Sequence, residues 1–152
     1  HRPGVAISQE SLRFVRLEDL GQWLPTVIKE DKEAVDIFAR TFRGLEELQV
    51  KLAEHFKLDD PGVPFHHKKI ITSAMRRIAP DGLATNIGWS ANPRTIRWVL
   101  EMRTAPSAEE EIRLVFGKIG EIMTKRYPNL FGDFVVENVD GLPYYKANNS
   151  KI

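Results

Sequence analysis

The chain has 152 residues, 42% of them hydrophobic, which is enough apolar material for one compact domain spanning residues 1–152. The 22 Lys and Arg residues nearly balance the 21 Asp and Glu residues, so no global field attracts nucleic acid or an anionic membrane. Cysteine is absent, which excludes disulfides, thiolate metal sites and cysteine nucleophiles. The sequence shows no long apolar run and no signal-peptide pattern, so we expect a cytoplasmic protein without membrane contact.

The first predicted element is a short strand over Leu12–Leu17, where side chains alternate after a polar loop. From Asp31 to Phe56, apolar residues recur at intervals of three and four, which is typical of a long amphipathic helix. A turn rich in Asp, Pro and Gly follows at residues 59–64. Another helix is predicted after it, ending at Pro80 and marked by Ile70, Ile71, Ala74, Met75 and Ile78.

A second strand is predicted over Leu83–Ser90, which has no helical stripe. Asn92 followed by Pro93 indicates a helix start. Asn can cap free N–H groups, and the N–H that Pro lacks would have no partner in the first turn of a helix. We expect this helix to run to about Thr104, before the interruption at Pro106.

A capping-box pattern of Ser107 and Glu110 predicts the start of the next helix, which ends near Pro128. Beyond it, Phe131–Val139 can form a strand, and Lys146–Ile152 has the composition of a frayed tail. These elements predict an α+β fold that is mostly helical, with a few strands of a twisted sheet.

Arg103 continues the apolar stripe of the helix that starts at Pro93. The stripe runs through Ile96, Val99 and Leu100, and Arg103 takes the next place in the series. A buried guanidinium needs an anion or several acceptors. Two interpretations remain open: the stripe ends one turn early and Arg103 reaches solvent, or Arg103 binds a ligand at the floor of a pocket.

The run Ser8–Arg13 places two hydroxyl groups, backbone N–H groups and an arginine close together, which suits a phosphate. Such a run before a strand is also ordinary turn chemistry. The start Asn92-Pro93-Arg94 is a potential anion site as well, although most helix starts of this kind are simply capped.

The histidines predict no metal site, because His66 and His67 are adjacent and diverge around a helix. Basic residues leave open a rival function from another class, a small helical nucleic-acid-binding module. Its phosphate contacts would come from Lys68, Lys69, Arg76, Arg77, Arg94 and Arg97. The balanced net charge argues against this rival.

The order of several motifs resembles that of the flavin-dependent thymidylate synthases, the ThyX family. His1-Arg2 resembles the end of the family's Arg-His-Arg signature, and Ser8–Phe14 resembles the Ser/Asn-Glu/Gln-x-Ser-x-Arg-Tyr half that follows. Further matches to the family's motifs lie at Arg76–Pro80, Asn92–Arg94, Met102-Arg103 and Glu111–Arg113. The resemblance covers almost the whole chain and implies a ThyX-like fold without its N-terminal segment.

The resemblance also implies a homotetramer that binds FAD between subunits and methylates dUMP to dTMP, with methylenetetrahydrofolate and NADPH as further substrates. Arg103 would be catalytic, stabilising negative charge on the uracil ring. The implied dUMP contacts are Gln9, Glu10, Ser11, Leu12, Arg13, Arg76 and Arg103. The implied FAD contacts are His1, Arg2, Gln9, Asn92, Arg94 and Trp98.

The sequence departs from the family's pattern at several positions. Phe14 replaces the usual Tyr, Trp98 replaces a polar Asn or His, and Ser107 replaces a frequent His. The family's N-terminal segment, which carries further FAD and dUMP contacts, is not in this sequence. We therefore expect little activity from these residues alone, and a non-catalytic remnant that assembles with a partner remains an alternative.

Overall fold

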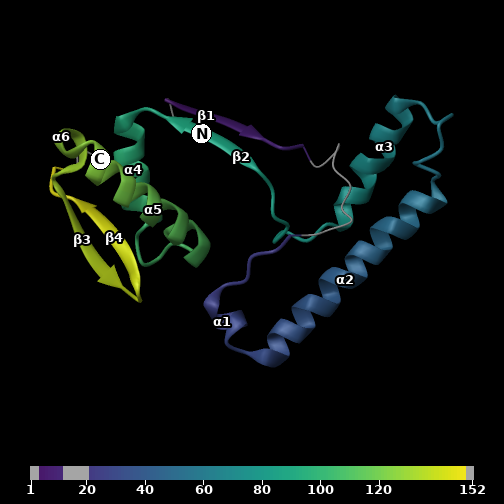
Figure 1. The fold of residues 1–152 in the computed structure, drawn as a ribbon, viewed down its shortest axis with the longest axis horizontal. Helices are drawn as coiled ribbons and strands as arrows, with labels where there is room; N and C mark the ends of the chain where they lie inside the picture. The colour runs from purple at the N-terminus through teal and green to yellow at the C-terminus, as the bar shows by residue number, and fades with distance from the viewer. Residues whose placement is uncertain (1–3, 12–20, 150–152) are drawn as a thin grey trace. The chain divides into compact units, whose positions relative to one another are not determined.

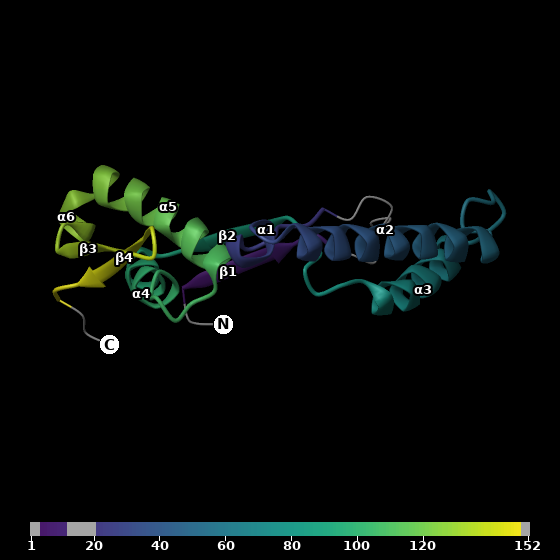
Figure 2. The same cartoon turned by 90° about the horizontal axis from the view of Figure 1, so that it is seen from below.

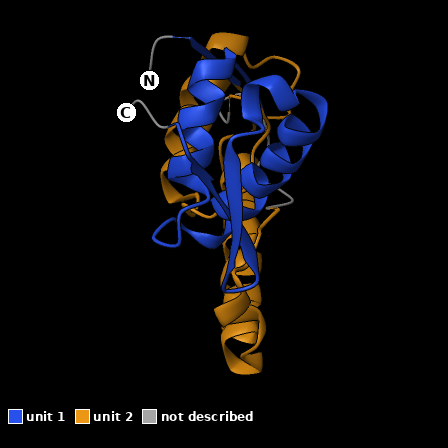
Figure 3. Cartoon of the chain, turned by 90° about the vertical axis from the view of Figure 1, so that its left-hand side faces the viewer, with its two compact units in different colours: residues 1–8, 88–152 blue, residues 9–87 orange. Residues whose placement is uncertain are grey.

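A computed structural model describes residues 4–11 and 21–149, and within them the chain forms helices and two small antiparallel sheets (Figure 1). The chain divides into two compact units (Figure 3): unit 1 comprises His1–Ser8 and Gly88–Ile152, and unit 2 comprises Gln9–Ile87. This content confirms the predicted α+β class. The strand predicted over Leu12–Leu17 lies outside the described residues.

Unit 2 is built on the long helix α2 (Lys32–His55), which confirms the helix predicted over Asp31–Phe56. Asp31 caps its start, since the carboxylate accepts a hydrogen bond from the Ala34 N–H at 3.0 Å. Helix α1 (Thr26–Lys29) precedes it.

Helix α3 (Phe65–Met75) lies beside the second half of α2, as Figures 1 and 2 show, and continues into a 3₁₀ turn, η1 (Arg76–Ile78). The two helices share a small core of Ala53, Leu58, Ile71 and Met75. A helix ending before Pro80 was predicted here and is confirmed, because η1 gives way to extended backbone at Ala79.

Unit 1 contains most of a two-stranded sheet that pairs β1 (Val5–Gln9) with β2 (Ile87–Ala91). Strand β2 confirms a strand in the region 83–90, although it begins later than predicted. Strand β1 was not predicted, because the run from Ser8 was interpreted as turn chemistry.

Helix α4 (Pro93–Arg103) confirms the predicted helix start: the Asn92 side chain accepts a hydrogen bond from the Thr95 N–H at 2.9 Å. Helix α5 (Glu110–Arg126) and the short α6 (Pro128–Phe131) follow. The predicted capping box at Ser107 is wrong. The N–H of Ala108 bonds instead to the carbonyl of Ala105, so the chain is still turning there, and the Glu109 carboxylate caps α5.

Strands β3 (Phe134–Val139) and β4 (Leu142–Ala147) form an antiparallel hairpin whose register pairs Val139 with Leu142. The two residues between them, Asp140 and Gly141, have φ values of 55° and 77°, which is typical of a tight hairpin turn. The predicted strand near 131–139 is thus confirmed. The frayed tail from Lys146 is wrong at its start, because β4 extends to Ala147.

The core of unit 1 joins the hairpin to α4 and α5. Leu100 and Phe131 are fully buried, and Tyr145 is nearly so. Gly117 and Gly120 on α5 leave space for Pro143 and Tyr145 of β4. The hairpin is therefore packed on both helices.

Candidate functional site

The structure brings four of the predicted site residues together on one helix. Asn92 caps α4, and Arg94, Trp98 and Arg103 lie along it, all in unit 1. The described remainder, which comprises Gln9, Glu10, Ser11 and Arg76, belongs to unit 2. Four predicted positions, His1, Arg2, Leu12 and Arg13, lie outside the described residues.

The start of α4 is held tightly against the start of β1. The Asn92 N–H donates to the Gly4 carbonyl at 3.0 Å, and a Cβ at Gly4 would collide with the Asn92 amide nitrogen. Gly4 has a φ of +85°, so both its backbone conformation and its surroundings require glycine. This contact joins Gly4, which lies just after the predicted FAD-binding pair His1-Arg2, to Asn92, which begins the predicted FAD-binding motif Asn92–Arg94.

The first turns of α4 can bind an anion. Pro93 has no N–H and Asn92 caps that of Thr95, so the amide and the exposed guanidinium of Arg94 are the donors that this turn offers. Trp98 lies one turn further on the same face and is partly buried. A cation beside an indole ring can hold a phosphate group next to a planar ring system.

Arg103 is exposed at the end of α4, which excludes the interpretation that burial forces it to bind an anion. The buried residue at this end is Thr104, which has no exposed surface. Its hydroxyl group donates to the Leu100 carbonyl at 2.7 Å and accepts from the Tyr145 N–H at 2.9 Å. Arg103 thus reaches solvent, where its guanidinium is accessible to a ligand.

The predicted phosphate loop begins at the end of β1. The Glu10 N–H donates to the Asn86 carbonyl at 2.9 Å, and the Asn86 amide donates to the Glu10 carboxylate at 3.0 Å. Gln9 is exposed and Ser11 is partly buried. Asn86, which no sequence signal singled out, binds the Glu10 carboxylate and so fixes the position of its negative charge.

Arg76 begins η1 directly after α3, and its side chain is exposed. The helix end before it is fixed by Gln49 of α2, which is buried and donates from Nε2 to the Met75 carbonyl at 3.1 Å. No sequence signal distinguished Gln49, because it lies between apolar residues on a regular amphipathic helix. It anchors the backbone from which Arg76 extends.

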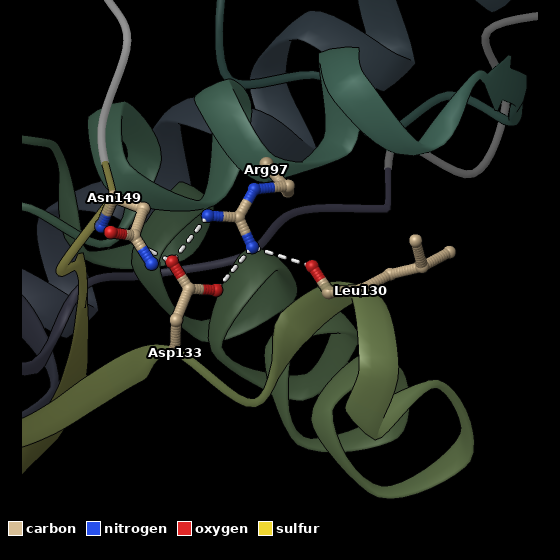
Figure 4. Close-up of polar contacts among 4 residues, drawn as sticks. All are labelled: Arg97, Leu130, Asp133 and Asn149. Atoms are coloured by element: carbon tan, nitrogen blue, oxygen red, sulfur yellow. Dashed lines mark hydrogen bonds and ion pairs between the residues drawn. The ribbon is translucent and has the colours of Figure 1, made fainter.

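A bidentate ion pair joins Arg97 of α4 to Asp133 (Figure 4). The Arg97 guanidinium beside Asp133 lowers the pKa of that carboxyl to about 2, and the same hydrogen bond raises the pKa of Arg97. Arg97 is one of the phosphate contacts expected of the nucleic-acid-binding rival. Its pairing weakens the nucleic-acid rival, since a neutralised arginine offers little to a phosphate backbone.

Arg113 is the buried arginine of unit 1, at 5% exposure. Its Nη2 donates to the Val139 carbonyl at 2.7 Å, while Nε has no hydrogen-bond partner within the described part of the chain. Arg113 therefore holds the hairpin turn against α5. Across residues 4–11 and 21–149, no group of three His, Asp or Glu side chains could hold a metal ion, and no helix is long and apolar enough to cross a membrane.

Residues 1–129 match the model of the family described as thymidylate synthase complementing protein. The chain belongs to this family. It is 31% identical over 138 residues to the flavin-dependent thymidylate synthase of Corynebacterium glutamicum, covering 88% of this chain and 54% of that protein. The Mycobacteroides abscessus enzyme of the same name is 29% identical over 129 residues, covering 84% and 52%.

A solved structure has the same fold: flavin-dependent thymidylate synthase ThyX from Helicobacter pylori, complexed with FAD and dUMP. The TM-score is 0.56 at 18% identity, covering 86% of this chain and 62% of that one. The family match confirms the resemblance recognised in the motifs, and the chain spans about half the length of the curated relatives. The hairpin β3–β4 lies beyond the residues that the family model matches.

Proposed function

We propose that this chain is part of an FAD-dependent enzyme that methylates dUMP to dTMP, with methylenetetrahydrofolate as carbon donor and NADPH as reductant. The observation that carries the proposal is the arrangement of α4, where a capped start, Arg94 and an exposed Arg103 follow the family's motif order. The relatives named above are flavin-dependent, and the H. pylori enzyme holds FAD and dUMP.

The first turns of α4 fit an FAD phosphate, because the Arg94 amide and guanidinium lie at the positive end of the helix dipole. Asn92 would orient this turn, and Trp98 would lie against the bound cofactor. His1, Arg2 and Gln9 are the further FAD contacts that we propose from the family motif. When bound, the flavin would carry the reducing equivalents that NADPH supplies.

The substrate dUMP would be bound by its phosphate and by its ring. We propose that Gln9, Glu10, Ser11, Leu12 and Arg13 form the phosphate loop and that Arg76 adds a charge to it. Asn86 would keep the Glu10 carboxylate turned to β2, because a carboxylate free to approach a phosphate would repel it. Arg103 would approach the uracil ring and stabilise the negative charge that develops there.

We further propose that the working assembly is a homotetramer and that these 152 residues alone have little or no activity. Half of the length of the relatives is not represented here, and FAD between subunits needs groups from more than one chain. In this view the chain supplies the phosphate loop and the uracil-facing arginine.

The test is the visible absorption spectrum of the full-length protein, followed by an assay of dTMP formation. We expect a yellow protein with a flavin band, and dTMP only when dUMP, methylenetetrahydrofolate and NADPH are all present. A colourless protein that takes up no added FAD would contradict the proposal. If FAD and dUMP bind but no dTMP forms, the non-catalytic remnant is the correct interpretation.

A further inference from the structure

We propose that Arg97, paired with Asp133, is a positioning residue for the flavin-binding side of α4. The inference rests on the proposed FAD site and adds to it a residue that the family's motifs do not include. It also gives the C-terminal hairpin a part in cofactor binding, although the hairpin lies outside the residues matched by the family model.

The contact between Arg97 and Asp133 is bidentate (Figure 4). Arg97 Nη2 donates to Asp133 Oδ2 at 2.7 Å, and Nη1 donates to both Oδ1 and the Leu130 carbonyl. The guanidinium carbon lies 4.7 Å from the centre of the Phe134 ring. With only 24% and 22% of the two side chains exposed, the pair is shielded from solvent and fixed in orientation as well as distance.

Asp133 is itself fixed by both strands of the hairpin. It directly precedes β3, and the Asn149 N–H, which follows β4, donates to its Oδ2 at 3.2 Å. The Asn148 N–H donates to the Asp133 carbonyl at 3.1 Å. Arg97 therefore joins α4 to the end of the hairpin opposite its turn, where β3 begins and β4 ends.

Helix α4 is thus held by the hairpin at two points. In the first half of α4, Arg97 binds Asp133. Just after the last residue of α4, Thr104 accepts a hydrogen bond from the Tyr145 N–H. Arg94 lies one turn before Arg97, and Trp98 follows it directly. Without the Arg97 contact, the first half of α4 loses its link to the hairpin and keeps the contact of Asn92 with Gly4 and the packing of Ile96, so the orientation of the turn that carries Arg94 and Trp98 is less restrained.

Charge gives the pair a second effect. Asp133 neutralises Arg97, so of the two arginines in the first turns of α4, Arg94 is the one left to attract a phosphate. If Asp133 loses its charge, Arg97 becomes a competing cation one turn away. Removing either partner should therefore disturb FAD binding, by loss of orientation in one case and by misplaced charge in the other.

The experiment measures the dissociation constant of FAD by flavin fluorescence, in the full-length protein and in the variants Arg97→Met, Arg97→Lys and Asp133→Asn. We expect about tenfold weaker binding for Arg97→Met and Asp133→Asn. We expect a smaller loss, about threefold, for Arg97→Lys, because lysine keeps the charge but cannot make the bidentate contact. The visible circular dichroism of bound flavin should change most in Arg97→Met and Asp133→Asn and less in Arg97→Lys.

The matched control is Lys146→Met, which removes an ion pair with Glu137 between the two strands of the same hairpin. FAD should bind to it as to the wild type. If Arg97→Met does not fold, Arg97→Lys and Asp133→Asn carry the test.

Three outcomes overturn the inference in distinguishable ways. If the wild type binds no FAD, the proposed function fails and this inference fails with it. If the wild type binds FAD and the variants at Arg97 and Asp133 bind it equally tightly while losing stability, the pair is structural only. If Lys146→Met weakens FAD binding as much as Arg97→Met, the effect belongs to the hairpin in general.

Discussion

Tyr145 of β4 occupies the space beside Gly120 of α5. A Cβ at position 120 would lie 2.5 Å from both Cε2 and Cζ of the tyrosine ring, and Tyr145 as a whole is only 4% exposed. Because the Tyr145 N–H also binds Thr104, the backbone of β4 cannot move away from α5 without breaking this contact at the end of α4. The glycine therefore sets how closely the hairpin and α5 approach.

We expect Gly120→Ala to lower the free energy of unfolding by about 1–3 kcal/mol, because overpacking outweighs the gain in helix propensity. Urea denaturation followed by circular dichroism measures this change. Gly44→Ala is the control: nothing lies within 4 Å of a Cβ there, so it should stabilise the protein by about 0.5–1 kcal/mol. Equal effects at the two positions would contradict the packing argument.

Asn92 should affect stability and cofactor binding separately. Asn92→Ala removes the cap on the Thr95 N–H and should cost about 1 kcal/mol in urea denaturation without flavin. Asn92→Asp keeps the cap and suits the helix dipole, so its stability should match the wild type. Its added negative charge should nevertheless weaken FAD binding severalfold, as flavin fluorescence measures. Unchanged FAD affinity in both variants would remove Asn92 from the cofactor site.

The pair of Arg97 and Asp133 predicts a particular dependence of stability on pH. The folded pKa of Asp133, about 2, lies below its unfolded value, so the stabilisation is present above about pH 4 and disappears as the pH falls to 2. We expect Asp133→Asn to be about 1–2 kcal/mol less stable at pH 7, after allowance for solvent screening. The gap between wild type and variant should close between about pH 4 and 2 in urea titrations. A gap that stays constant over this range would show that the carboxylate charge contributes nothing.

Arg103 should matter for the reaction and hardly for stability. Its side chain is exposed, so Arg103→Ala should change the free energy of unfolding by less than about 0.5 kcal/mol. The rate of dTMP formation by the full-length enzyme should fall about a hundredfold or more, because a charge that stabilises the transition state is lost. Arg126→Ala, at another exposed arginine of unit 1, is the control and should leave the rate unchanged. Wild-type turnover by Arg103→Ala would remove this arginine from the mechanism.

Local signals in the sequence predicted the elements whose causes are local. The apolar spacing of α2 and the cap at Asn92 depend on residues within a few positions of one another, and both were confirmed. The start of α5 was missed by two residues, since Glu109 and not Ser107 is its cap. Ser107 with Glu110 has the pattern of a capping box, but a turn closed by Ala105 and Ala108 keeps the chain from becoming helical there.

Features that depend on residues far apart in the sequence could not be predicted from local patterns. Strand β4 contains Pro143 and lacks a clean alternation, and it forms because β3 pairs with it and because α5 offers two glycines. The burial of Thr104 rather than Arg103 follows from a hydrogen bond to Tyr145, 41 positions away. Arg97 carried no signal that separated it from other surface arginines, since its partner lies 36 positions further along.

The turn at Asp140 and Gly141 has a consequence for the neighbouring pair of tyrosines. Successive residues of a strand face opposite sides of the sheet. This two-residue turn fixes the register in which β4 pairs with β3, so that Tyr145, and not Tyr144, faces α5. A slip of β4 by one place would present Tyr144 to the glycine and move the amide that binds Thr104. The length of one loop thus selects which of two adjacent, chemically identical rings completes the interior of unit 1.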